Sequence, residues 1–181
     1  MNSNSKIYTD PCSKKHDDEC ETSRRCIRKI EKQKFVLLKV GDPTSTPLPA
    51  LSVVGTTITV ASLTVNTREL DDPEIKIDFT SNIVLPVGVT VGTTLTFQVN
   101  KFFINPLTPL VSVPVGPAFI FTVPVAVAFS DAFTFFVKDP DDFGCGLVRY
   151  TVTVTIGGVA LAVAASINNA TLAAIIAAEE D

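Results

Sequence analysis

The sequence is poor in charge and in the residues that most often carry catalysis. Charged residues make up 19% of the 181 positions, tryptophan is absent, and histidine occurs once, as His16. Because the one histidine lies in a polar segment, the chain cannot form a Ser–His–Asp triad on a rigid scaffold. The sequence also has no GxSxG motif and no glycine-rich phosphate loop. The sequence therefore predicts a protein that is not an enzyme and that holds no cofactor.

An apolar leader is also absent. Residues 1–20 are polar and contain no apolar core of a secretory signal peptide, so none is expected. Three uncharged runs, 79–100, 102–130 and 151–178, are long enough to span a bilayer. They carry threonine at frequent intervals, and the middle run contains five prolines. We therefore interpret them as strands and expect no membrane span.

The charges that are present divide the chain in two. Residues 1–34 hold nine Lys or Arg and six Asp or Glu, whereas residues 35–181 hold six and thirteen. This indicates an N-terminal connector over 1–34 and a separate domain over 35–181. The connector's small positive excess and its one tyrosine, Tyr8, argue against a nucleic-acid partner. A basic connector beside an acidic body instead suits binding to another copy of the same chain.

The domain alternates apolar and polar residues in short stretches, as strands with one buried face do. The expected strands are 35–40, 56–65, 74–79, 93–100, 118–127, 133–137, 148–156, 159–165 and 170–178. The last stretch could also form a helix, but its neighbours favour a strand. The pattern predicts an all-β fold of eight or nine strands, a jelly-roll-like β-sandwich with an extended N-terminal connector. An immunoglobulin-type sandwich is disfavoured because tryptophan is absent.

Local signals predict how these strands begin, bend and end. A slip in the alternation near Ala61–Ser62 indicates a β-bulge or a kink, and Pro124 indicates a bulge or an edge strand. Gly157-Gly158 predicts a two-residue hairpin between two consecutive strands. The remaining turns are expected at Gly41–Pro49, Asn66–Glu74, Lys138–Gly146 and Asn168-Asn169.

The cysteines are the candidate functional residues. Cys12, Cys20 and Cys26 lie in the connector, and Cys145 lies between two glycines in a turn of the domain. Lys and Arg neighbours lower the pKa of a thiol and speed disulfide exchange, so disulfides are the favoured interpretation. Pairs with another subunit, pairs within the connector or with the chain's own body, and free thiols remain open.

Metal sites are alternatives with less support. The connector cysteines and His16 make a four-ligand set for zinc, but their spacing contains no CxxC. Asp139, Asp141 and Asp142 could hold calcium, although aspartates in a proline-containing turn are favoured for turn geometry alone. We therefore expect no metal.

The uncharged strands predict how copies associate. Natural sheets protect their exposed edges with charge, especially lysine, yet Thr93–Asn100 and Thr151–Ile156 carry none. We therefore expect the domain to associate with copies of itself through strand edges. Most of the twelve phenylalanines fall in the apolar phase of strands, which favours a core over an aromatic binding platform.

Several segments carry a family resemblance: TITVASLTVNTREL, EIKIDFTSNIV, TLTFQV and CGLVRYTVTVT. They resemble an uncharacterised β-rich domain family of spore-forming Firmicutes. In layout the chain is also similar to the subunits of endospore appendages, which are pilus-like fibres of jelly-roll subunits with a cysteine-bearing connector. The resemblance implies a jelly roll that adds to its neighbour's sheet, with connector disulfides from Cys12, Cys20 and Cys26 and with Cys145 as a candidate partner.

The leading hypothesis is therefore a structural subunit of a disulfide-crosslinked fibre or surface layer. The resemblance implies a place on the spore surface, reached from the cytoplasm without a signal peptide. The alternative is a jelly-roll binding module for carbohydrate or a coat protein, anchored by its tail.

Overall fold

The fold contains nine strands and no helix in the part of the chain that the structure describes. The structure is a computed structural model, and it describes residues 34–68, 70–89, 91–104, 110–123, 128–140 and 146–179. The strands are β1 Lys34–Val40, β2 Thr44–Leu48, β3 Thr57–Asn66, β4 Asp71–Leu85, β5 Thr94–Ile104, β6 Ser112–Thr122, β7 Phe129–Asp139, β8 Leu147–Gly157 and β9 Ala165–Glu179. The all-β prediction is confirmed, and the stretch 170–178 belongs to a strand.

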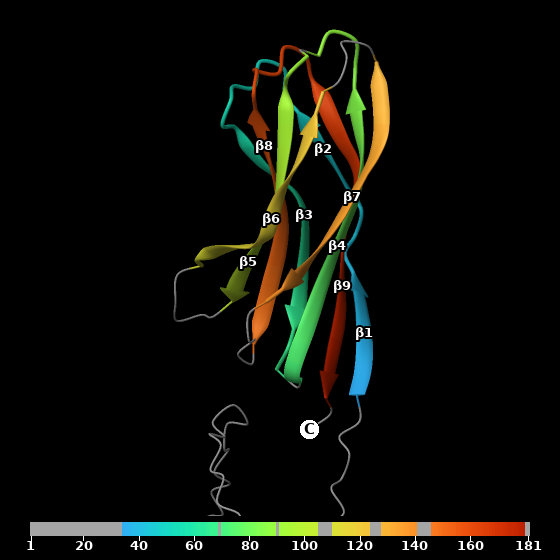
Figure 1. Cartoon of the computed structure of the whole chain (residues 1–181), viewed down its shortest axis with the longest axis vertical. Helices are drawn as coiled ribbons and strands as arrows, with labels where there is room; N and C mark the ends of the chain where they lie inside the picture. Colours follow the sequence, from blue (N-terminus) through green and yellow to red (C-terminus); the bar gives the residue numbers. More distant parts are fainter. Residues whose placement is uncertain are drawn as a thin grey trace, which may run out of the picture.

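The strands form two antiparallel sheets that face each other along the long axis of the molecule (Figure 1). The first sheet has the order β1-β9-β4-β7, with β2 also paired to β9, and the second has the order β3-β8-β5-β6. The pairs β1–β9, β3–β8, β4–β7 and β5–β6 are nested, so the chain is one long antiparallel ribbon folded at the β5–β6 connection. Rolling that ribbon into two sheets adds the β4–β9 and β5–β8 pairs and gives a jelly roll.

The core lies between the sheets and follows the alternation seen in the sequence. Ile75, Ile77 and Phe79 of β4 are buried, as are Leu95 and Phe97 of β5. The expected bulge is also present: the β3–β8 register shifts between Thr59 and Ala61, one residue before the predicted position. Every second residue of these strands therefore faces the opposite sheet, as the alternation predicts.

Two predicted turns are partly strand: residues 41–43 and the 67–70 region do connect strands, but the rest of each stretch does not. The stretch 41–49 contains β2, which tolerates Pro47 because β2 lies at the margin of its sheet, where a missing N–H is harmless. Asp71-Asp72-Pro73 opens β4 and does not form a turn; the β4–β9 register is irregular between Asp71 and Glu74. The turn predicted over 138–146 begins later, because Lys138 and Asp139 still belong to β7.

The predictions for the C-terminal third are wrong in two places. Gly157-Gly158 does not close a hairpin, because β8 and β9 lie in different sheets and residues 158–164 pass between them. Leu161, which is fully buried, anchors this crossing by a bridge to Ser52. Asn168-Asn169 lies inside β9, where Asn169 takes a φ of 53° beside a register shift against β4. Asparagine tolerates this left-handed conformation, so the strand continues through it.

The two strands that the uncharged-edge prediction named are not edges. β5 pairs with β8 and β6, and β8 pairs with β3 and β5, so both lie inside the second sheet. A strand with partners on both sides needs no protective charge, which explains their composition. The strand expected over 118–127 is β6, an edge strand that ends at Thr122, and residues 124–127 lie outside the described residues.

Candidate functional sites

The predicted cysteine sites all fall outside the described residues. Cys12, Cys20 and Cys26 precede β1, and Cys145 directly precedes Gly146. His16, Asp141 and Asp142, which completed the zinc and calcium alternatives, also lie outside. The described residues contain no cluster of His, Cys, Asp or Glu that could hold a metal ion. They also contain no helix with the length and hydropathy of a membrane span.

Every side chain of β1 from Val36 to Val40 is exposed. The strand is the terminal one of the first sheet and pairs with β9, so its other edge has no strand partner within the described ranges. Val36, Leu38 and Val40 face outward and are 67%, 68% and 56% exposed. Leu37 pairs with buried Ile176 on the inner side of the sheet, yet it is 45% exposed. The second sheet therefore does not cover the inner face of β1, which lies at the margin of the first sheet (Figure 1), and side chains on both faces of the strand are exposed.

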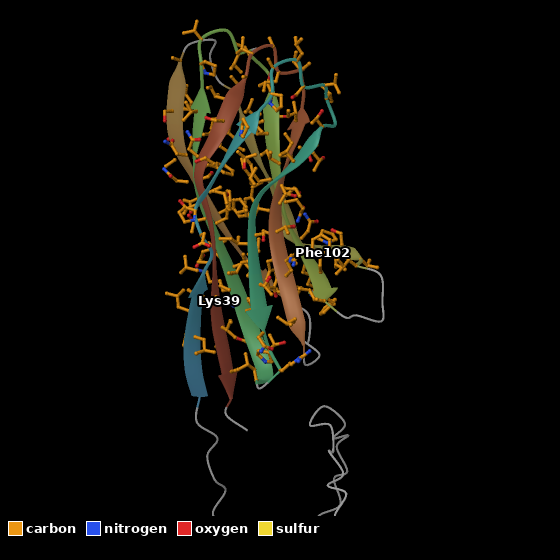
Figure 2. The ribbon with its side chains drawn as sticks, turned by 180° about the vertical axis from the view of Figure 1, so that it is seen from behind. Lys39 and Phe102 are labelled. Carbon is orange, nitrogen blue, oxygen red and sulfur yellow. The ribbon has the colours of Figure 1, made fainter. Side chains whose placement is uncertain are left out.

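One charge interrupts this apolar strand. Lys39 pairs with Ala174, which is buried on the inner face of the first sheet, and yet Lys39 is exposed. Figure 2 labels it at the margin of the molecule, with Phe102 of the second sheet on the other side. An inward-pointing lysine on an edge strand is one way in which natural sheets limit pairing with other chains.

The apolar surface of β1 continues over the outer face of the first sheet. Cross-strand neighbours of β1 on this face are Ala173, Ile175 and Ala177 of β9. A shallow hollow of ≈ 330 Å³ lies next to them, lined by Glu74, Ile75, Lys76, Phe136, Lys138, Ile175 and Ala177. We call this the outer apolar face: Val36, Leu38, Val40, Ala173, Ile175, Ala177 and Phe136.

Ion pairs border the outer apolar face. Lys76 Nζ lies 2.9 Å from Asp78 Oδ1 and 4.7 Å from the centre of the Phe136 ring. Lys138 Nζ lies 2.9 Å from Glu74 Oε1 in an exposed pair. Exposed pairs of this kind contribute about 0–1 kcal/mol to stability, so they add little to the stability of the sheet. They form a polar rim around the outer apolar face.

The other sheet edges differ in how well they are protected. β6 carries Pro114 and Pro117, and its register against β5 shifts between Phe97 and Val99. β7 carries Asp131 and Lys138. β3 carries neither proline nor charge, and β8 is the strand that pairs with it. The first residue of β2 approaches β3: the Thr44 hydroxyl donates a hydrogen bond to the Val60 carbonyl.

A buried charged cluster lies between the sheets. Lys101 of β5 is 1% exposed and Asp139 of β7 is 2% exposed. Lys101 Nζ lies 2.9 Å from Asp139 Oδ1, and the Tyr150 hydroxyl of β8 donates to Asp139 Oδ2 at 3.0 Å. The Lys101 ammonium also lies 5.4 Å from the centre of the Phe103 ring. We call Lys101, Asp139 and Tyr150 the buried cluster.

Strand alternation places these three side chains in the core. Lys101 continues the inward phase of Leu95, Phe97 and Val99, and it pairs across the sheet with Tyr150. Asp139 continues the inward phase of Phe135 and Val137 from the facing sheet. From the sequence, Asp139 was expected in a turn and Lys101 was not singled out. A charged residue in the apolar phase of a strand is nevertheless a signal that could have identified both.

Comparison with known proteins gives a family without an assigned activity. Residues 35–177 match the family described as "Domain of unknown function (DUF4489)". No curated protein matches the sequence.

Solved structures with a similar fold share little sequence with this chain. Two infectious bursal disease virus structures, of the Gt and Gx strains, are 12% and 11% identical, each with a TM-score of 0.47. They align over 96% and 80% of this chain, which spans only 42% and 32% of those chains. Dimeric latent PorU from Porphyromonas gingivalis is 10% identical, with a TM-score of 0.42. The alignment covers 82% of this chain and 13% of the PorU chain. We draw nothing about function from these proteins.

Proposed function

This chain belongs to the DUF4489 family of domains of unknown function, and we propose that it is a structural subunit that self-assembles through the free edge of β1. The observation that carries the proposal is the combination, on one strand, of an edge without a partner among the described strands and apolar side chains exposed on both faces. An edge strand of this kind is a template for adding a strand from another chain. Burying one of its Val or Leu side chains contributes about 1.5–3 kcal/mol, and the added strand also gains main-chain hydrogen bonds.

The partner in this proposal is a second copy of the chain. Pairing of β1 with β1 of another copy would be self-complementary and would stop at a dimer. Pairing of β1 with a different edge is head-to-tail, and it produces a fibre when the rotation between subunits does not close a ring. β3 suits this role best among the described edges, because it lacks both the prolines of β6 and the charges of β7.

The connector locks this assembly covalently in our proposal. Cys12, Cys20 and Cys26 lie upstream of β1 in the sequence, so strand pairing through β1 would bring the connector to the neighbouring subunit. Gly146, which follows Cys145, accepts a hydrogen bond from the Thr67 amide at the end of β3. That end of the sandwich is also where β1 begins beside the end of β9. Disulfides between connector cysteines and Cys145 of a neighbour are therefore part of the proposal.

The biological setting is proposed from the resemblance to endospore appendage subunits. On that basis the fibre or surface layer belongs on the spore, and its disulfides form after it leaves a reducing cytosol. We propose no enzymatic activity. The alternative, a carbohydrate-binding module, has less support, because the exposed rings of Phe103 and Phe136 lie on different sheets and form no joint platform in the described domain.

The test compares charge substitutions at two valines of equal exposure. Val36 of β1 is 67% exposed, and Val53, in the β2–β3 connection, is 66% exposed. The full chain is purified with reductant, and sedimentation velocity and negative-stain electron microscopy measure its assembly. The wild type and Val53→Lys are expected to form filaments, and Val36→Lys is expected to shift toward single subunits. Equal assembly of both variants, or a wild type that stays monomeric with and without reductant, would contradict the proposal.

A further inference from the structure

The buried cluster joins the two sheets from opposite sides of the core. Lys101 and Tyr150 are cross-strand neighbours in the second sheet, and Asp139 reaches them from the last position of β7 in the first. The amine and the carboxylate are in hydrogen-bond contact and are almost fully enclosed, with side-chain exposures of 1% and 0%. Contact between an amine and a carboxylate in a dry, fixed position is the arrangement from which an amide can form.

We propose that Lys101 and Asp139 condense into an amide, so that a covalent isopeptide bond links the two sheets. This inference is independent of the proposed assembly. One proton first passes from Nζ to Oδ1 along the existing hydrogen bond, which gives a neutral amine and a carboxylic acid. The Nζ lone pair then attacks Cγ, and the new N–C bond forms as the Cγ–Oδ1 bond breaks. Oδ1 leaves as water with a second proton from Nζ, so an ammonium and a carboxylate become one amide and one water.

The surroundings favour each part of this reaction. The folded strands hold Nζ against the carboxyl group, which replaces a collision by a fixed contact. The Tyr150 hydroxyl donates to Oδ2, the oxygen on which negative charge develops when Nζ attacks Cγ. Burial lowers the free-energy gap between the ion pair and the neutral pair, because charges lose their hydration there. Burial also keeps bulk water away from the finished amide.

The bond would be a covalent crosslink within the domain that requires no cysteine. It would join residues that are 38 positions apart and enclose the end of β5 and the whole of β6 and β7. A crosslink between the sheets stabilises the fold mainly by restricting the unfolded chain. Unlike a disulfide, the amide persists in a reducing environment, so the domain would be crosslinked before any disulfide forms.

Mass spectrometry of the full chain tests the proposal directly. The protein is denatured and reduced, its intact mass is measured, and a tryptic digest is sequenced. We expect a mass below the sequence mass by one water molecule, and a branched peptide that joins Lys101 to Asp139 without cleavage after Lys101. A mass equal to that of the sequence, with linear peptides cleaved after Lys101, would overturn the proposal. Loss of water that maps to other residues would overturn it equally.

Three comparisons separate bond formation from simple ion pairing. Lys138 and Glu74 form a pair at the same 2.9 Å distance, but the pair is exposed, so its peptides are expected to stay linear. The double variant Lys101→Met/Asp139→Leu keeps the core apolar and is expected to have its full sequence mass. Tyr150→Phe retains the amine and the carboxylate, and we expect a smaller bonded fraction at a fixed time after synthesis of the chain. An unchanged fraction in Tyr150→Phe would overturn the assisting role of the hydroxyl.

Discussion

Gly116 of β6 lies so close to Val137 of β7 that a Cβ atom on Gly116 would be 2.8 Å from Val137 Cγ1. The two strands belong to different sheets, so this contact closes one side of the sandwich. Gly116 also has a φ of +66°, and the β5–β6 register shifts nearby. Just beyond it, the Phe119 ring stacks on Phe135 at 4.2 Å. The glycine lets β6 turn toward β7, which seals the aromatic part of the core.

Replacement of Gly116 by alanine is expected to destabilise the domain through both strain and overlap. The positive φ costs about 1–2 kcal/mol for a residue with a Cβ, and overpacking against Val137 costs about 1–3 kcal/mol more. Gly55 is the control, because it has a φ of +91° and a Cβ added there would meet no atom within 4 Å. Urea unfolding should show a larger loss for Gly116→Ala than for Gly55→Ala; equal losses would mean that the contact with Val137 is unimportant.

Thr93 and Thr67 should respond in opposite ways to replacement by valine. Both side chains are fully buried. Thr93 Oγ1 has no hydrogen-bond partner in the described structure, so Thr93→Val is expected to stabilise the fold by about 1 kcal/mol. Thr67 Oγ1 donates to the Gly146 carbonyl at 2.9 Å, so Thr67→Val is expected to destabilise it by about 1–3 kcal/mol. Thermal and urea unfolding of the two variants measure this difference in sign.

The buried cluster predicts that replacing Asp139 alone destabilises the fold more than replacing Asp139 and Lys101 together. Asp139→Leu leaves the Lys101 charge in the core without this carboxylate, which costs about 3–5 kcal/mol. Lys101→Met/Asp139→Leu removes both charges and replaces them with apolar side chains, so its loss is expected to be smaller. Urea unfolding of both variants gives the comparison. A double variant less stable than Asp139→Leu would show that the Lys101 charge left in the core is not the dominant cost.

Lys39 is predicted to restrain assembly. Lys39→Val makes β1 uninterrupted in apolar character from Val36 to Val40 and removes the charge that opposes pairing. The concentration at which filaments first appear in light scattering should fall. Arg149→Val is the control, because Arg149 is exposed on β8, which has strand partners on both sides, and it should leave that concentration nearly unchanged. A rise for Lys39→Val would mean that the lysine instead assists subunit contact.

The strands of this fold could be predicted because their signal is local. Alternation in the segments around Ile75–Phe79, Leu95–Val99 and Val148–Ile156 reports one buried face, and all three are strands with that face in the core. The slip in alternation at Ala61 likewise reports a bulge, since an extra residue changes the phase of a strand.

Strand partners could not be predicted, because pairing in a jelly roll joins distant residues. Gly157-Gly158 satisfies the local requirements of a hairpin, yet β8 pairs with β3 and β5 and not with β9. The same limitation made the uncharged segments Thr93–Asn100 and Thr151–Ile156 look like exposed edges, although β5 and β8 each have two strand partners; the exposed apolar edge described above is β1. Absence of charge has two causes, burial between partners and use as a contact surface, and composition alone does not distinguish them.

The buried cluster was missed for a different reason. Asp139 follows the apolar run of β7 and precedes Pro140, so local sequence favours a turn. Its burial depends on Lys101, 38 positions away, which offsets the cost of removing the carboxylate from water. Charged residues in the inward phase of two strands were the available signal, and their pairing required the fold.

Hydrogen exchange of the assembled and dissociated protein tests the central claim most directly. If β1 pairs with a neighbouring copy, the backbone amides of its free edge form hydrogen bonds on assembly, and the peptide covering 34–40 should exchange much more slowly. The peptide covering the β4–β5 connection at 86–89 should exchange equally in both states. Unchanged exchange over 34–40 in filaments, with protection arising on another strand, would contradict assembly through β1.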